Sequence, residues 1–214
     1  MSFLIVPGAG DFRDLLRELR PSPGYCVFGD IVGSTSLKER GLSDWVRLIY
    51  NAFATVQGWL AEIGAPLKGL GDSLMFFAER DDFRNRGMTP LGLFARLASI
   101  AAEGTGEPIL PVRIGACYCE ESYDISFLPN ARDVYGRDID LAARLVAIAE
   151  EGEVVINAPF AHQIQADYGN VGNQDDFTEI TRLVGPWPVR PKGFTTAVSV
   201  YKLPASTSGR ARAS

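Results

Sequence analysis

The sequence predicts one α+β domain, an α/β sandwich in which helices pack on a mostly antiparallel sheet. The chain has 214 residues, 46% hydrophobic and 22% charged, so it can bury one sizeable core. Short apolar runs typical of strands alternate with longer segments of helical periodicity. Their order, β-α-β-β-α-β, is that of the ferredoxin-like split arrangement, with helices on one face of the sheet and additions at the C-terminal end.

The first half of the chain supplies the β-α-β-β part of this order. Trp45, Leu48 and Ile49 belong to an apolar stripe at helical spacing, and Gly71-Asp72 is typical of a hairpin turn. The predicted elements are an amphipathic helix over 11–20, a break at 21–24, a buried strand over 25–31, a helix over 43–63, hairpin strands over 66–70 and 73–77, and a polar loop over 81–88.

The second half completes the core and adds to it. The predicted elements are a helix over 90–102, a strand over 112–118, an extended segment over 134–136, a helix over 138–150, a strand over 153–156, a helix over 159–165, and closing strands over 177–184 and 195–203. We expect residues 1–23 to form an N-terminal helical extension, residues 24–203 the domain, and residues 204–214 a disordered tail.

Composition excludes several classes of function. A net charge of -5 gives no basic surface for nucleic acid, and no apolar run approaches the ~20 residues that span a bilayer. We therefore expect a cytoplasmic protein without an attached sensor or membrane domain. Cys26, Cys117 and Cys119 have no disulfide-like spacing, and the last two lie in an apolar run that favours a buried strand over a metal site. We expect His162, the single histidine, to be structural.

A carboxylate, Asp30, stands near the end of a predicted apolar strand, before a glycine turn and a helix start. An unpaired Asp is costly in a buried strand, so a metal ion or a helix cap would compensate for it. The backbone amides of Gly33, Ser34 and Thr35 are also placed to bind a phosphate. At this stage the helix cap and the ligand site both remain open.

A second carboxylate, Asp72, lies at the tip of the predicted hairpin. Alone it is typical of ordinary turn chemistry. Neighbouring strands of the split fold can bring Asp30 and Asp72 together, and two such carboxylates suit hard divalent ions whose shells are completed by phosphate oxygens. A pair of ions about 3.5–4 Å apart can hold an attacking and a leaving oxygen.

Five segments, in the same order, resemble the catalytic domain of class III adenylate and guanylate cyclases. They are Phe28–Thr35, Lys68–Asp72, Val112–Gly115, Asp133–Arg144 and Pro191–Gly193. Each motif is weak by itself, whereas the ordered set is specific and extends over about residues 24–203.

The resemblance implies a head-to-tail homodimer with two composite active sites at the interface and two divalent ions, Mg²⁺ or Mn²⁺, as cofactors. Asp30 and Asp72 match the metal-binding aspartates, with the Ile31 carbonyl beside them. Arg113 and Lys192 match positions that hold the triphosphate. The resemblance assigns the metal ligands to one subunit.

The other subunit would supply the remaining groups. Arg144 matches the arginine that stabilises the transition state, and Lys68 and Asp133 match the pair that reads the base. Two simpler interpretations stay open for the cations. Arg144 could form a surface i,i+4 ion pair with Asp140, and Lys192 could be a solvated turn lysine.

The chain departs from the family at two positions. Asp140 stands where the family usually has Asn, which puts in question how the ribose or α-phosphate is oriented, because an ionised Asp cannot donate a hydrogen bond. Tyr50 stands near another usual Asn, and its ring would either pack in the core or fill space in the nucleotide pocket. A donor at Lys68 and an acceptor at Asp133 can be satisfied by adenine, cytosine or uracil.

Three functions are therefore compatible with the sequence. We favour a pyrimidine cyclase that converts UTP to cyclic UMP, or CTP to cyclic CMP, similar to the Pycsar cyclases of bacterial antiphage defence, whose product activates a separate effector. The alternatives are an ATP-using signalling cyclase and a catalytically silent cyclase-like module that binds nucleotide or dimerises. Retention of Asp30, Asp72 and Arg144 argues against the silent module.

Overall fold

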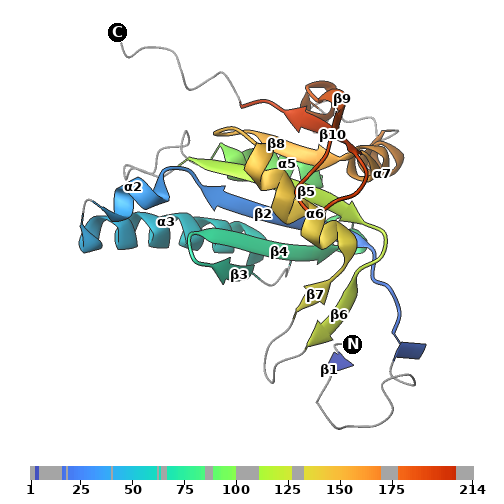
Figure 1. Cartoon of the computed structure of the whole chain (residues 1–214), viewed down its shortest axis with the longest axis horizontal. Coiled ribbons are helices and arrows are strands. Elements are labelled where there is room, and N and C mark those ends of the chain that lie inside the picture. The colour runs from blue at the N-terminus through green and yellow to red at the C-terminus, as the bar shows by residue number, and fades with distance from the viewer. Residues whose placement is uncertain are drawn as a thin grey trace.

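The computed structural model describes residues 3–4, 16–17, 19–39, 41–61, 63, 67–84, 89–99, 111–126, 133–169 and 178–205. Its main feature is a seven-stranded sheet with strand order β3-β4-β2-β5-β8-β10-β9 (Figure 1). The first four strands in this order and two helices form the predicted split core. Their bounds are β2 Gly24–Ile31, α3 Leu42–Ala61, β3 Leu67–Leu70, β4 Ser73–Glu79, α5 Pro90–Ala98 and β5 Val112–Cys119.

The C-terminal additions extend this core at the β5 edge. Strand β8 pairs parallel to β5, and β10 returns antiparallel between β8 and β9. The added elements are α6 Arg137–Leu145, the short 3-10 turn η1 Val146–Ile148, β8 Val154–Asn157, α7 Ala158–Tyr168, β9 Val184–Val189 and β10 Val198–Leu203. The α+β fold class is confirmed, and the β5–β8 pair makes the sheet mixed rather than purely antiparallel.

Helices cover both faces of the sheet, which differs from the predicted one-sided arrangement. On one face α3, α5 and α7 bury Val56, Phe94 and Phe160 against strand residues. On the other face α6 packs on the strands that carry Cys26 and Cys117. The apolar alternation of β2 and β5 therefore serves two separate cores.

Glycine 115 lets α6 lie directly on β5. A Cβ at Gly115 would stand 2.4 Å from the Val146 backbone nitrogen and 2.5 Å from the Ala142 carbonyl oxygen. No other residue type can accept so close a backbone approach without a shift. This contact fixes the height of α6 above the sheet, and α6 carries two of the predicted site residues, Asp140 and Arg144.

A second, three-stranded sheet lies beside the main one, with strand order β1-β6-β7. Its strands are β1 Phe3–Leu4, β6 Tyr123–Ser126 and β7 Val134–Tyr135. The sequence predicted only the extended segment at 134–136, and neither β1 nor β6. Strands this short leave too few residues for a readable alternation.

The predicted loop over 81–88 is wrong for its first part, because α4 spans Arg80–Arg84. Phe83 is fully buried and supplies the apolar anchor of this single turn. The Asp82 carboxylate accepts a hydrogen bond from the Glu79 backbone N–H at 3.0 Å, as in a capping box. Residues 85–88 lie outside the described part of the chain.

The predicted strand over 177–184 is also wrong. Residues Thr178–Thr181 form the short helix α8, and the strand β9 begins only at Val184. β9 contains Pro186 and Pro188, and the sequence did not predict a strand over these residues. β9 is the outer strand of the sheet, and an edge position tolerates residues that lack a backbone N–H.

The remaining predicted strands and helices are confirmed within a few residues, and the predicted helix over 138–150 ends earlier, in α6 and η1. The predicted helix over 11–20 and tail over 204–214 fall largely outside the described residues; residues 16–17 are helical and 19–23 irregular. Within the described part of the chain, no helix combines the length and apolarity needed to cross a membrane. Cys26, Cys117 and Cys119 are buried free thiols, as the strand interpretation requires.

Candidate active site

Asp30 is held between two neighbouring strands. The strand register places Ser73 of β4 and Arg113 of β5 directly opposite it, so the three side chains project from the same face of the sheet. The Ser73 hydroxyl donates to Asp30 Oδ1 at 2.9 Å. Arg113 Nε and Nη2 donate to Asp30 Oδ2 at 2.9 and 2.6 Å. The Asp30 carboxylate is therefore paired with Ser73 and Arg113, and it does not cap a helix.

Asp72 lies in the tight turn between β3 and β4, where Gly71 adopts a left-handed φ of 72°. Its Oδ2 accepts a hydrogen bond from the Ser34 hydroxyl, and the Lys38 ammonium lies 3.3 Å from the same oxygen. The Ser34 hydrogen bond is the main cause that lowers the pKa of Asp72 below its ordinary value, and Lys38 lowers it further against the effect of partial burial. Asp72 is therefore an anion at neutral pH.

The turn after β2 leads from Asp30 to Ser34, which is hydrogen-bonded to Asp72. Gly33 is the N-cap of α2, Ser34–Lys38, with a left-handed φ of 76°. Because glycine has no side chain, the N-terminus of this helix has no side-chain capping hydrogen bond from its N-cap. Ser34 is buried, and its hydroxyl bonds Asp72 rather than the helix end. The predicted turn at Gly33 therefore caps the helix N-terminus through its backbone and not through a side chain.

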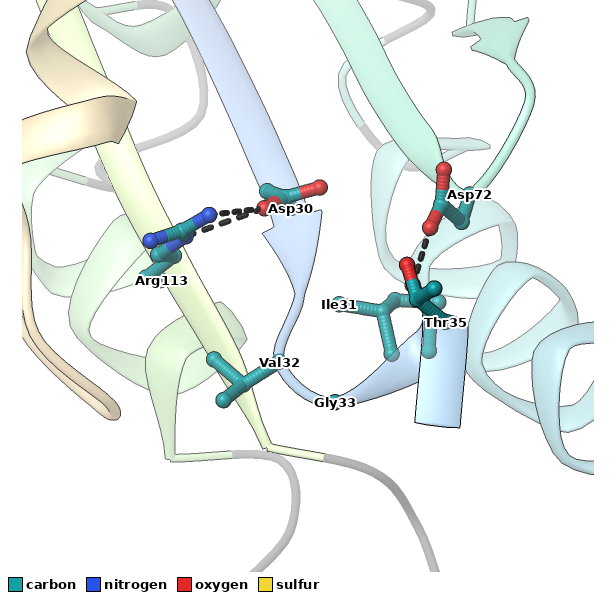
Figure 2. Close-up of a pocket in the computed structure, with 8 residues that line it drawn as sticks. Asp30, Ile31, Val32, Gly33, Thr35, Asp72 and Arg113 are labelled. Carbon is teal, nitrogen blue, oxygen red and sulfur yellow. Dashed lines mark hydrogen bonds and ion pairs between the residues drawn. The ribbon is translucent and has the colours of Figure 1, made fainter. Parts of the chain in front are cut away.

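Asp30 and Asp72 face one pocket of about 370 Å³. Figure 2 shows both carboxylates above the turn at Val32 and Gly33, with Arg113 on the side of Asp30 away from Asp72. The pocket is lined by Asp30, Ile31, Val32, Gly33, Ser34, Thr35, Asp72 and Arg113. Every metal-site and turn residue predicted from the sequence lies in this set, together with Arg113.

The donor set fits a hard divalent cation. Two carboxylates and the backbone at Ile31 offer oxygen ligands, which Mg²⁺ and Mn²⁺ prefer. Both carboxylates already attract cations, since Arg113 pairs with Asp30 and Lys38 with Asp72. Within the described ranges, no cluster of three or more His, Cys, Asp or Glu side chains forms an alternative metal site. A two-carboxylate site leaves coordination positions for substrate oxygens.

The predicted base-reading pair is formed within one chain. Lys68 Nζ donates to Asp133 Oδ2 at 2.6 Å, and the Tyr135 hydroxyl donates to the same oxygen at 3.2 Å. Asp133 Oδ1 accepts from the backbone N–H of Val134 at 3.0 Å. A carboxylate has about four acceptor positions, so one remains for a further donor. Sequence reasoning missed Tyr135, two residues after Asp133.

Three further predicted site residues, one acidic and two basic, lie elsewhere. Asp140 and Arg144 are exposed on α6, and no ion pair joins them, so the proposed i,i+4 pair is absent. Lys192 is exposed in the turn between β9 and β10, at the far edge of the sheet from β3. None of the three lines the pocket that contains Asp30.

Tyr50 lies on α3 with 69% of its surface exposed, so its interpretation as a core aromatic is wrong. It does not line the pocket at Asp30 either. His162 is exposed on α7, away from these groups. Two residues that contact the carboxylates, Ser73 and Lys38, were not predicted. A signal existed for each, because Ser73 follows Asp72 and Lys38 stands one helical turn after Ser34.

Comparison with solved structures identifies the architecture. The adenylyl cyclase CyaB from P. aeruginosa matches with a TM-score of 0.64 and 20% identity, over 90% of this chain and 98% of that one. The chain has the class III nucleotide cyclase fold. An adenylate cyclase from Trypanosoma brucei matches this fold with a TM-score of 0.67 and 17% identity, over 90% and 92% of the two chains. A guanylate cyclase domain from Catenaria anguillulae, in complex with GTP, matches with a TM-score of 0.63 and 16% identity, over 86% of this chain and 97% of that one.

The chain matches no protein-family model, and no curated protein is matched by its sequence. The predicted fold is thus confirmed by shape at low sequence identity.

Proposed function

We propose that the protein is a metal-dependent nucleotide cyclase that converts a nucleoside triphosphate to a 3′,5′-cyclic monophosphate and pyrophosphate. The observation that carries this proposal is the pocket in which Asp30 and Asp72 meet the turn of Gly33, Ser34 and Thr35. Two carboxylates beside a backbone turn suit a triphosphate whose charge is neutralised by divalent ions. The pocket stands in a fold shared with adenylyl and guanylyl cyclases.

Each group has a role in ring closure. Asp30, Asp72 and the Ile31 carbonyl would hold two Mg²⁺ or Mn²⁺ ions, which when bound lower the pKa of the ribose 3′-hydroxyl and neutralise the leaving pyrophosphate. The backbone amides at 33–35 would bind phosphate oxygens. Arg113, which holds Asp30 in this state, lies at the pocket wall and can exchange that carboxylate for a phosphate with the same planar fork.

A second copy of the chain would complete the site. Arg144 and Lys192 are exposed cations that lie outside the Asp30 pocket of their own chain, and the Lys68–Asp133 pair is separate from that pocket too. A head-to-tail homodimer would place these groups opposite the metal ligands, so that Arg144 meets the charge that develops on the α-phosphate. A guanylyl cyclase domain of similar fold, from Blastocladiella emersonii, is described as a non-canonical dimer, so dimers of this fold occur in more than one arrangement.

For the base, we favour UTP or CTP, with UTP ahead. The exposure of Tyr50 supports this choice, because an exposed ring on α3 is free to fill space beside a small base. Asp133 has one acceptor position left, which uracil N3–H or the cytosine amino group can use. Asp140 would orient the ribose as an acceptor rather than through an Asn donor. Cyclic UMP or cyclic CMP would then act as an antiphage signal on a separate effector in a bacterial cytoplasm.

Adenylate cyclase activity is the second candidate, because Lys68 and Asp133 can read N1 and the amino group of adenine equally well. A silent nucleotide-binding or dimerising module ranks third, since both carboxylates and Arg144 are present. Incubating the purified chain with each of the four triphosphates and Mn²⁺, and separating cyclic products by chromatography, decides among the three. Cyclic AMP as the dominant product would refute the pyrimidine preference, and no cyclic product would favour the silent module.

The composite site has its own test. An Asp30→Asn chain and an Arg144→Ala chain should each be inactive alone. Mixed in equal amounts they should recover about a quarter of wild-type activity, because half of the dimers are mixed and each mixed dimer contains one intact site. Failure of the mixture to recover any activity, with both chains folded and dimeric, would refute the two-subunit site.

A further inference from the structure

Lys38 contacts the candidate metal site without belonging to the predicted set. Its Nζ lies 3.3 Å from Asp72 Oδ2, and 39% of its side chain is exposed. It is the last residue of α2, one turn after Ser34, so both side chains project to the same side of this short helix. Ser34 and Lys38 therefore converge on one oxygen of Asp72.

A second contact holds the same ammonium from another direction. Lys38 Nζ lies 5.9 Å from the centroid of the Trp45 ring, within the range of a cation–π interaction. Trp45 belongs to α3, which follows α2 after a short connection. If the bond to Asp72 is lost, the ring still offers the ammonium a favourable position at the pocket edge.

We propose that Lys38 is the resident counterion of Asp72, which a divalent ion must displace from that carboxylate on loading and which then rests on Trp45. The inference rests on the proposed metal site. One ammonium supplies a single positive charge to Asp72, as Arg113 does to Asp30, so the metal-free pocket is neutral. A divalent ion bound beside Asp72 repels the ammonium, because like charges a few ångströms apart disfavour each other.

Lys38 thus weakens metal binding by the nucleotide-free protein and stabilises the metal-free pocket. Lys38 contacts a predicted ligand residue, Asp72, so we assign it the charge balance of that carboxylate and no chemical step. Arg113 cannot take the same part at Asp72, because its two donors are on Asp30.

The test is a Mn²⁺ titration of nucleotide-free protein, with free Mn²⁺ measured by electron paramagnetic resonance. Lys38→Met should bind Mn²⁺ about tenfold more tightly than wild type, which corresponds to about 1.4 kcal/mol. Lys38→Arg keeps the positive charge and should bind within about twofold of wild type. Lys202→Met is the matched control, because Lys202 also pairs with a carboxylate, Glu153 at 2.9 Å, on β10 away from the pocket.

Asp72→Asn distinguishes a failure of the proposed metal site from a failure of the counterion role of Lys38. If Asp72→Asn leaves Mn²⁺ binding unchanged, the metal site itself is wrong. If Asp72→Asn weakens binding but Lys38→Met binds no more tightly than wild type, the metal site stands and the counterion role is refuted. Thermal melts in EDTA check that each variant folds and should show a lower Tm for Lys38→Met. Lys38→Gln replaces Lys38→Met if the latter does not fold, with the same expected gain.

Discussion

Replacing Gly115 by alanine tests whether the contact between α6 and β5 positions the half-site on α6. The new Cβ would stand 2.4 Å from the Val146 nitrogen and 2.5 Å from the Ala142 oxygen, whereas ordinary contacts begin at 3.4 Å. Both neighbours are backbone atoms, so no side chain can rotate away. The helix must move outward by roughly 1 Å at this point.

The expected cost follows from this shift. Overpacking of a well-packed core typically costs about 1–3 kcal/mol, and alanine recovers about 0.4–1 kcal/mol by restricting the unfolded chain. The difference lies between about 0 and 2.6 kcal/mol, and its middle value, about 1.3 kcal/mol, corresponds to a fall in Tm of roughly 3–5 °C for a domain of this size. The displaced helix also carries Asp140 and Arg144, so cyclase activity should fall by tenfold or more, because catalytic groups tolerate little misplacement.

Gly58→Ala is the matched control. Gly58 lies inside α3, and a Cβ added there would have no neighbour within 4 Å outside the helix backbone, so the same change should raise the free energy of unfolding by about 0.5–1 kcal/mol and leave activity intact. Differential scanning calorimetry and the cyclisation assay measure both effects. Wild-type stability and activity of Gly115→Ala, with α6 still on the sheet, would refute the argument that this close contact sets the helix position.

Two further predictions concern single contacts, and a third concerns the metal ions. Tyr135→Phe removes the hydroxyl that donates to Asp133 and should raise KM for the preferred triphosphate about threefold to tenfold with little change in kcat; an unchanged KM in steady-state kinetics would contradict this role. Burial raises the pKa of Asp167, but hydrogen bonds from Arg80 and Gln163 outweigh burial and lower the pKa in the folded protein. The ionised Asp167 therefore stabilises the fold at a pH above the pKa of the unfolded chain. This stabilisation is lost as the pH falls through the pKa of Asp167 in the folded protein. Asp167→Asn should therefore unfold about 1–3 kcal/mol more easily than wild type at pH 7 in urea titrations, and the difference should shrink as the pH falls through the lowered pKa of Asp167. EDTA should abolish cyclisation and Mn²⁺ or Mg²⁺ restore it; full activity in EDTA would exclude the metal mechanism.

Much of the fold could be predicted from the sequence because long helices and strands repeat their apolar pattern over many residues. The stripe along α3 and the apolar runs of β2 and β5 predict helix and strands, and the Gly71-Asp72 turn predicts the hairpin. Short elements failed for a physical reason. A single turn such as α4 depends on one buried side chain, Phe83, and the edge strand β9 contains prolines that only an edge position tolerates.

The candidate site could also be predicted only in part. Asp30, Asp72 and the turn at Gly33 are recognisable because a charge at the end of a buried strand and a glycine turn before a helix both demand a partner. The sequence could not name that partner. Strand register, which aligns residues far apart in the chain, places Ser73 and Arg113 opposite Asp30.

The local pattern of the chain was thus enough to predict the fold class, and the ordered set of motifs singled out the two carboxylates as candidates. Packing decided the rest: that α6 covers the second face, that Tyr50 points to solvent, and that Lys38 rather than a distant cation pairs with Asp72. Such contacts join elements whose relative placement depends on the whole core, so a local pattern can suggest a residue such as Lys38 but cannot identify the group that it contacts.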